Sequence, residues 1–322
     1  MDKLDLLMGM SLLLAFTFGI FFSYVAPANS IVLIYIEYFI FFLFSIAIFG
    51  GLILRKFLPN LTAFLIDYYG YGLMFLSAGI FFVPVLNVAG LAFSLIYVSL
   101  VVFLSGVMLI LYRDNWKAHL NLFTLFTSAM FATYIGSVTG VPLMIEIFMG
   151  LCVYDIMAVF RTKLMATLVS KVLHSKTIPP MFLTDMDLPT VIAKLDNNLP
   201  KNVEIKGHFI GNGDVIMASA FAISVGMGMN VTYGLLLLVA GFIGIKLNFA
   251  ISNARKVGLP ALPLIFITEL MALVALNHPT LVTCMYCIGG IAAGYYFIDG
   301  MAIGAAKRKE KLLAEQAAKN AA

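Results

Sequence analysis

Long apolar stretches alternate with short polar segments along the chain, and ten apolar stretches follow one another from end to end. A transmembrane helix needs about 20 mostly apolar residues, and most of these stretches reach that length. They cover residues 6–26, 31–54, 64–86, 89–112, 119–140, 142–161, 208–229, 231–250, 259–277 and 280–304. The pattern therefore predicts an all-α polytopic membrane protein with ten spans.

One polar stretch divides the predicted spans into two groups. The resulting segments are 1–161 with six spans, the polar stretch 162–207, 208–304 with four spans, and a basic tail at 305–322. In the polar stretch, apolar residues four apart predict a helix from Lys163 to Ser175, and alternation from Val203 to Lys206 predicts a short strand. A loop of this length between spans is more often functional than idle, although a solvated tether has a similar composition.

Composition and charge support a membrane protein. Apolar residues make up 62% of the chain and charged residues 11%. A soluble domain needs more polar residues to cover its surface, so this composition excludes a soluble enzyme, a disordered chain and a nucleic-acid-binding protein. All 20 Lys and Arg residues fall on one side of the ten-span arrangement. The positive-inside rule makes that side cytoplasmic, together with both termini and the 162–207 loop.

The first span is predicted to be retained in the mature protein. The sequence Ala26-Pro27-Ala28 resembles a signal-peptide cleavage site, but the preceding apolar run is long for such a peptide. Asp2 and Asp5 also interrupt the basic region that a signal peptide needs. Cleavage would leave the sidedness of the later spans unchanged.

Seven acidic residues lie in or beside the predicted spans, where a buried charge costs about 2.5–3.5 kcal/mol or more. They are Glu37, Asp67, Glu146, Asp155, Asp214, Glu269 and Asp299. Asp67, Glu146 and Asp299 lie near span ends, and we expect structural roles for them at the interface. Glu37 and Glu269 lie deeper, and we expect them to be protonated or hydrogen-bonded to neighbouring spans.

Asp155 and Asp214 lie at matched depth in consecutive spans. Asp155 precedes the end of its span at Arg161 by six residues, and Asp214 follows the start of the next span at His208 by six. At a helical rise of 1.5 Å per residue, both carboxyls are expected roughly 9 Å below the same face. Two carboxyls that meet in a low dielectric share one proton: the ionised group accepts a proton from water, and the protonated group donates to a carbonyl oxygen. This arrangement is the dyad of aspartic proteases, which titrates as a pair.

The residues next to the two acids fit such a site. Gly211 and Gly213, in the sequence Gly-Asn-Gly-Asp, allow close backbone approach and weaken the helix, although glycine is common in membrane helices. Tyr154 precedes Asp155, and its hydroxyl is a candidate hydrogen-bond donor near a dyad, whereas an isolated Tyr-Asp pair carries little information.

A proline pair opens the ninth predicted span. The segment consists of Pro260, Ala261, Leu262 and Pro263. Two prolines remove two backbone donors, and irregular backbone at membrane depth is tolerated only against protein or a water-filled cavity. The segment is therefore expected to border a wet site. The plainer interpretation is an ordinary helix start, where one proline is common.

Three motifs, in this order, resemble those of the presenilin and signal peptide peptidase family of intramembrane aspartic proteases. The stretch from Tyr154 to Phe160, continuing through Thr162 and Met165, is similar to the YD span of that family. Residues 211–214 match its GxGD motif, and residues 260–263 match its PALP motif. The resemblance covers about residues 119–277, and it extends to the first four spans only by their number and character.

The resemblance implies a catalytic pair, Asp155 and Asp214, supported by Tyr154, Gly211 and Gly213, with residues 260–263 binding substrate. The substrate it implies is a transmembrane helix unwound locally into a strand, for which residues 203–206 would offer an edge. The loop orientation resembles presenilin rather than signal peptide peptidase, which is inverted. The family core has nine spans, so residues 280–304 form a tenth span that places the C-terminus in the cytoplasm. The compact size resembles a prokaryotic, archaeal member that works in the cell membrane without partner subunits.

Three other functions use similar features. Prepilin-type peptidases also have a membrane GxGD, but they usually have fewer spans and no PALP. Transporters and channels use buried acids as proton relays, although this chain shows no inverted repeat. A scaffold that has lost its activity is disfavoured because both acids are present.

No cofactor or metal is expected. Cys284 and Cys287 form a CxxC, a pattern found in redox and metal sites, but a second ligand pair is missing. We expect the two thiols to pack as small apolar residues. The expected partners are transmembrane-helix substrates and the lipid bilayer, with no nucleic acid; the sequence predicts neither the natural substrate nor the oligomeric state.

Overall fold

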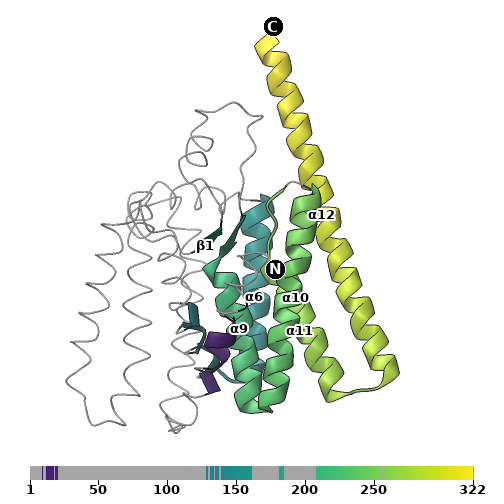
Figure 1. The fold of residues 1–322 in the computed structure, drawn as a ribbon. Coiled ribbons are helices and arrows are strands. Elements are labelled where there is room, and N and C mark those ends of the chain that lie inside the picture. Colours follow the sequence, from purple (N-terminus) through teal and green to yellow (C-terminus); the bar gives the residue numbers. More distant parts are fainter. Residues whose placement is uncertain are drawn as a thin grey trace, which may run out of the picture. The chain divides into compact units, whose positions relative to one another are not determined.

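The described structure is helical apart from one two-stranded sheet (Figure 1). This computed structural model describes residues 9, 12–17, 19–20, 128–129, 131–133, 135–137, 139–161, 181–184, 208–255 and 257–321. The predicted spans at 31–54, 64–86 and 89–112 lie outside the described residues, as do the predicted helix at 163–175 and the predicted strand at 203–206.

The named elements begin with α6 and end with α12. They are α6 (Val141–Ile156), the π-helical turn η2 (Met157–Arg161), β1 (Met181–Thr184), β2 (His208–Gly211), α9 (Asn212–Gly228), α10 (Val231–Arg255), α11 (Leu262–Asn277) and α12 (Leu281–Ala321). Among the described residues, three helices are long and apolar enough to cross a membrane: Val141–Arg161, Val231–Arg255 and Leu281–Leu312. They confirm the helical fold class for the described residues and indicate an integral membrane protein.

The structure adds detail at two of the predicted boundaries. The span predicted at 208–229 begins with strand β2, and its helix starts only at Asn212. The tail predicted at 305–322 is helical as far as Ala321 and continues α12 without a break. That tail consists largely of Ala, Lys, Glu and Leu, which are strong helix formers, and no glycine or proline follows Gly304.

The chain divides into two compact units, and the division falls within α6 and α10. The first unit comprises Met1–Ile147 and Met165–Leu238, and the second comprises Phe148–Leu164 and Val239–Ala322. Asp214 and the sheet therefore belong to the first unit, and Asp155 and residues 260–263 belong to the second.

In the first unit, α9 is a buried helix. Every residue from Val215 to Gly226 is buried, as expected for an apolar helix that other helices surround. Small residues allow those neighbours to come close: a Cβ placed on Gly234 would lie 2.8 Å from the Cα of Gly226. The hydroxyl of Ser224 donates to the Thr139 carbonyl at 2.7 Å, which satisfies a polar group inside the unit.

The two strands lead directly into α9. They pair antiparallel, with Met181 opposite Gly211 and Thr184 opposite His208, and β2 ends where α9 begins (Figure 1). Asn212 is the first residue of the helix, and its buried side-chain oxygen accepts a hydrogen bond from the Ser128 hydroxyl. The sheet and this hydrogen bond together position the N-terminus of α9.

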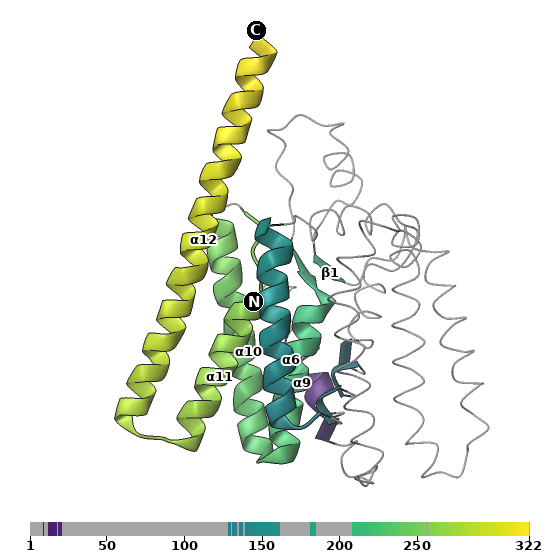
Figure 2. The same cartoon turned by 180° about the vertical axis from the view of Figure 1, so that it is seen from behind.

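In the second unit, α10, α11 and α12 pack through glycine contacts. The helices α11 and α12 lie side by side in both views of the molecule (Figures 1 and 2). A Cβ on Gly294 of α12 would lie 2.7 Å from the Ile267 side chain of α11. A Cβ on Gly244 of α10 would lie 2.7 Å from the Ile265 Cα and 2.9 Å from the Leu264 carbonyl oxygen. These distances show that α10 and α11 touch backbone to backbone.

We therefore predict that Gly244→Ala destabilises the protein, because the new methyl group meets backbone atoms that cannot rotate away. The expected loss is about 1–3 kcal/mol of unfolding free energy, measured as a lowered thermal midpoint in detergent. Gly289→Ala is the matched control, because Gly289 lies within α12 and its Cβ would meet nothing within 4 Å. That substitution should leave the midpoint unchanged or raise it. Equal losses in both variants would show that the α10–α11 contact is not tight.

Candidate active site

Asp155 lies in the last turn of α6, at the point where the helix changes its hydrogen bonding. Its side chain is 5% exposed, and Ile156 is the final α-helical residue. The next five residues, Met157–Arg161, form the π-helical turn η2. Short π turns inside α-helices are rare and are frequent at functional sites. Tyr154 is half-buried next to the acid, and the contact of its hydroxyl with a dyad stays a prediction.

The carboxyl of Asp155 accepts a hydrogen bond from the first residue of α11. The Leu262 N–H lies 3.3 Å from the Asp155 Oδ2. The first four N–H groups of a helix lack partners within the helix, and the preceding Ala261 has no side-chain oxygen to accept one. Pro263 has no N–H at all. Asp155 thus takes the place of an N-cap side chain for α11 from a helix 107 residues away in the sequence.

The proline segment packs against protein among the described residues, and a wet site beside it stays a prediction. Residues 260–266 are all buried, and the aromatic rings of Phe148 and Phe266 pack with centroids 5.0 Å apart. Of the two settings that tolerate irregular backbone at membrane depth, the described residues show the first, which is contact with protein.

Asp214 lies in the first turn of α9, as the third helical residue after the N-cap position at Gly211. The predicted depth of Asp214 was based on a helical rise from His208. That basis is wrong, because residues 208–211 form a strand, which rises further per residue than a helix. The carboxyl is near the N-terminal end of a helix dipole, where the positive partial charge favours acidic groups. Asp214 is half-buried.

The two glycines of the GxGD motif have different surroundings. A Cβ on Gly211 would lie 3.1 Å from the Asp214 Oδ2, whereas a Cβ on Gly213 would meet nothing within 4 Å. Gly211 therefore leaves room for the carboxyl of Asp214, and Gly213 is exposed. The role of Gly213 in the site stays a prediction.

Within each unit, predicted site residues come together. The second unit joins Asp155 to the segment 260–263, and the first unit joins Gly211 to Asp214. The pairing of Asp155 with Asp214 stays a prediction. The capping contact of Asp155 was not predicted from the sequence, although Pro263 and the apolar Ala261 together indicate a helix start without a cap of its own.

The remaining acids in the apolar stretches have varied surroundings. Asp299 forms a two-pronged ion pair with Arg255, and Glu146 is exposed. Glu269 is fully buried, and neither of its carboxyl oxygens has a hydrogen-bond partner among the described residues. The choice between a protonated carboxyl and a hydrogen bond to a neighbouring span therefore stays open for Glu269. Glu37 and Asp67 lie outside the described residues.

The described residues contain no group of three His, Cys, Asp or Glu side chains that could hold a metal ion. Cys284 and Cys287 are free thiols on α12, and Cys287 is buried. The chain matches no protein-family model, and it matches no curated protein. The functional interpretation therefore depends on the residues and their geometry.

The different surroundings of the two glycines generate a prediction. Gly211→Ala should push the Asp214 carboxyl from its position, because the added methyl group comes closer to the Asp214 Oδ2 than ordinary van der Waals contact allows. We expect a loss of at least about tenfold in any activity that needs Asp214. Gly213→Ala has space for its methyl group and adds helix propensity, so its loss should be smaller. Initial rates of the two purified variants test this, and a larger loss in Gly213→Ala would contradict it.

Proposed function

We propose that the protein is an intramembrane aspartic endopeptidase that hydrolyses peptide bonds within transmembrane helices. The observation that carries the proposal is the hydrogen bond from Leu262 to Asp155, because it joins an acid buried in an apolar helix to the proline segment within one compact unit. The three motifs support a member of the presenilin and signal peptide peptidase family of archaeal type.

In the proposed reaction, Asp155 and Asp214 share one proton. The ionised carboxyl takes a proton from a water molecule, and the resulting hydroxide attacks the scissile carbonyl carbon. The protonated carboxyl donates to the carbonyl oxygen, and collapse of the tetrahedral intermediate then breaks the carbon–nitrogen bond as the amine nitrogen is protonated. The role of each acid is left open, since a coupled pair titrates as a unit.

The proposed substrate is a single transmembrane helix that unwinds into an extended segment. The sheet of β1 and β2 supports this part of the proposal, because β2 ends three residues before Asp214. A two-stranded sheet has two outer edges, and a substrate strand that adds to one of them gains backbone hydrogen bonds. The predicted edge at 203–206 lies outside the described residues and stays a prediction beside the sheet of β1 and β2. The proposed arrangement has ten spans, with both termini and the 162–207 loop in the cytoplasm.

A proton-coupled transporter or channel is the second candidate, and Glu269 is the observation that favours it. Buried acids without partners are typical of proton pathways in membranes. Glu269 is such an acid, yet no other acidic side chain in the described residues forms a hydrogen bond with it. We rank this candidate below the protease because it leaves the Asp155–Leu262 contact unexplained.

Neutral variants of the two acids test the proposed reaction. Asp155→Asn and Asp214→Asn should each reduce cleavage of a labelled single-span helix by at least about 100-fold, because one proton-transfer partner is lost. Asn at 155 still has an oxygen that can accept the Leu262 N–H, so the thermal midpoint should change little.

Glu146→Gln is the matched control, since Glu146 is an exposed acid on the same helix. It should cleave at the wild-type rate. Full activity in either Asp variant would exclude that residue from the dyad. Proton flux that depends on Asp155, in a preparation that cleaves no helix, would favour the transporter.

Proline substitutions test the proposed strand contact. Neighbouring residues in a strand direct their N–H groups to opposite edges of the strand. Of the variants Phe182→Pro and Leu183→Pro, one therefore removes an N–H that bonds to β2. The other removes an N–H on the outer edge, where a substrate strand would add. Both variants should slow cleavage of a transmembrane helix, measured as kcat/KM at equal amounts of folded protein. Wild-type rates in both would show that this sheet does not bind substrate.

A further inference from the structure

The helix α12 contains none of the three motifs, yet it packs on the segment that connects α10 to α11. Ile298 and Ala302 of α12 are fully buried and form a cluster with Ile251 of α10 and Leu264 of α11. Leu264 follows Leu262 by two residues. The cluster therefore fixes α11 directly after the proline segment.

The same cluster also fixes the chain before the proline segment. Residues 257–261 form neither helix nor strand, so side-chain contacts must hold them in place. Val257, Leu259 and Tyr295 pack against the cluster. In addition, the Ser252 hydroxyl donates to the Val257 carbonyl at 2.8 Å. The segment 260–263 is thus held at both of its ends.

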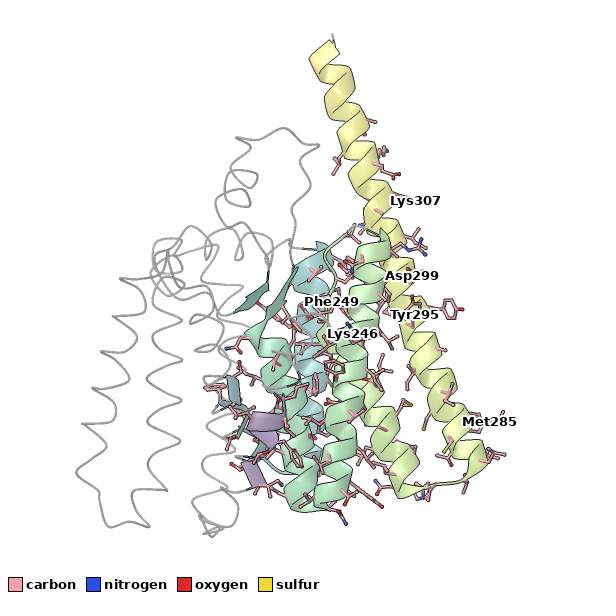
Figure 3. The ribbon with its side chains drawn as sticks, in the orientation of Figure 1. Lys246, Phe249, Met285, Tyr295, Asp299 and Lys307 are labelled. Atoms are coloured by element: carbon pink, nitrogen blue, oxygen red, sulfur yellow. The ribbon has the colours of Figure 1, made fainter. Side chains whose placement is uncertain are left out.

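An ion pair fastens α12 to the last residue of α10. The Arg255 Nε and Nη2 atoms each lie 2.7 Å from a carboxylate oxygen of Asp299, in a two-pronged arrangement. Figure 3 labels Asp299 on α12. Isolated surface ion pairs usually stabilise a protein little, but two-pronged pairs are stronger and fix the relative orientation of their partners. The Arg255 side chain is 39% exposed and that of Asp299 is 15% exposed, so solvent screens the charges, and the two-pronged geometry is what fixes the orientation.

We propose that the α12 contact face, defined as Tyr295, Ile298, Asp299 and Ala302, positions the proline segment against Asp155, and that Arg255 and Asp299 are positioning residues for catalysis. The inference rests on the proposed protease function. Its physical basis is the Leu262–Asp155 distance of 3.3 Å, which is already longer than most N–H···O bonds. A displacement of the segment by about 1 Å would break that bond and move the substrate-binding residues, a change that can cost about 100-fold in rate.

Charge exchange tests this inference in the full-length protein. The variants are Arg255→Asp, Asp299→Arg and the double exchange, which restores an ion pair with reversed polarity. Two measurements are made on each: backbone amide hydrogen exchange over residues 257–264, and kcat and KM for cleavage of a labelled single-span helix. Lys307→Asp is the control, because it changes an exposed charge of α12 beyond the contact face (Figure 3).

In each single charge-reversal variant, the backbone amides of 257–264 should exchange about tenfold faster than in the wild type. Its kcat should be about tenfold lower, with little change in KM. The double exchange should recover most of both losses, and Lys307→Asp should match the wild type. Asp299→Asn keeps the shape of the side chain, so it tests the ion pair even if a reversed charge prevents folding. In this variant the amides at 257–264 should exchange about threefold faster, and kcat should fall about threefold.

Wild-type exchange and kcat in the single variants and in Asp299→Asn would overturn the inference. A double-exchange variant as impaired as the single variants would also overturn the inference, because Arg255 and Asp299 would then not act through their contact with each other. If the wild type cleaves no substrate, the proposed function fails while the amide exchange still decides whether α12 positions the segment. If the wild type cleaves and the variants match it in both measurements, only the positioning role fails.

Discussion

The hydrogen bond from the Leu262 N–H to Asp155 is the contact on which the rest of the second unit depends. It gives the start of α11 a partner that its own sequence cannot supply, because Ala261 has no polar side chain and Pro263 has no N–H. In an apolar environment an unpartnered N–H is costly, so the bond stabilises the helix start and the position of the acid together. The same atom, the Asp155 Oδ2, therefore serves the fold and belongs to the carboxyl that the proposed chemistry uses.

In the first unit, Asp214 also lies near the start of a helix, but different contacts hold that helix start in place. The strand β2 ends directly before the first residue of α9. The Ser128 hydroxyl donates a hydrogen bond to the side chain of Asn212, two residues before Asp214. Gly211 leaves space for the carboxyl where a side chain would intrude. Both acids thus lie close to an irregular or extended backbone segment and to the N-terminal end of a helix. An acid near such a helix end meets backbone donors and a positive partial charge, which lipid or a regular helix interior would not provide.

The helical elements of the described residues could be predicted from the apolar pattern, because runs of about 20 apolar residues have few other solutions. The strand at 208–211 could not be predicted in this way. Phe209 and Ile210 continue the apolar run of α9, and a short apolar segment looks the same whether it is strand or helix. The capping role of Asp155 was also beyond the sequence, because it joins residues 107 positions apart. The acids and the proline segment themselves were recognisable, since charge and proline are rare in apolar stretches.

The π-helical turn after Asp155 has a consequence for insertions and deletions in this region. A π turn holds about one residue more than an α turn, so Arg161 faces about 100° away from the direction that regular winding without the extra residue would give it. A deletion of one residue within 157–161 would restore regular winding without touching Asp155, yet it would turn Arg161 to another face of the helix. The number of residues in 157–161, more than the identity of their side chains, therefore sets the direction in which Arg161 faces.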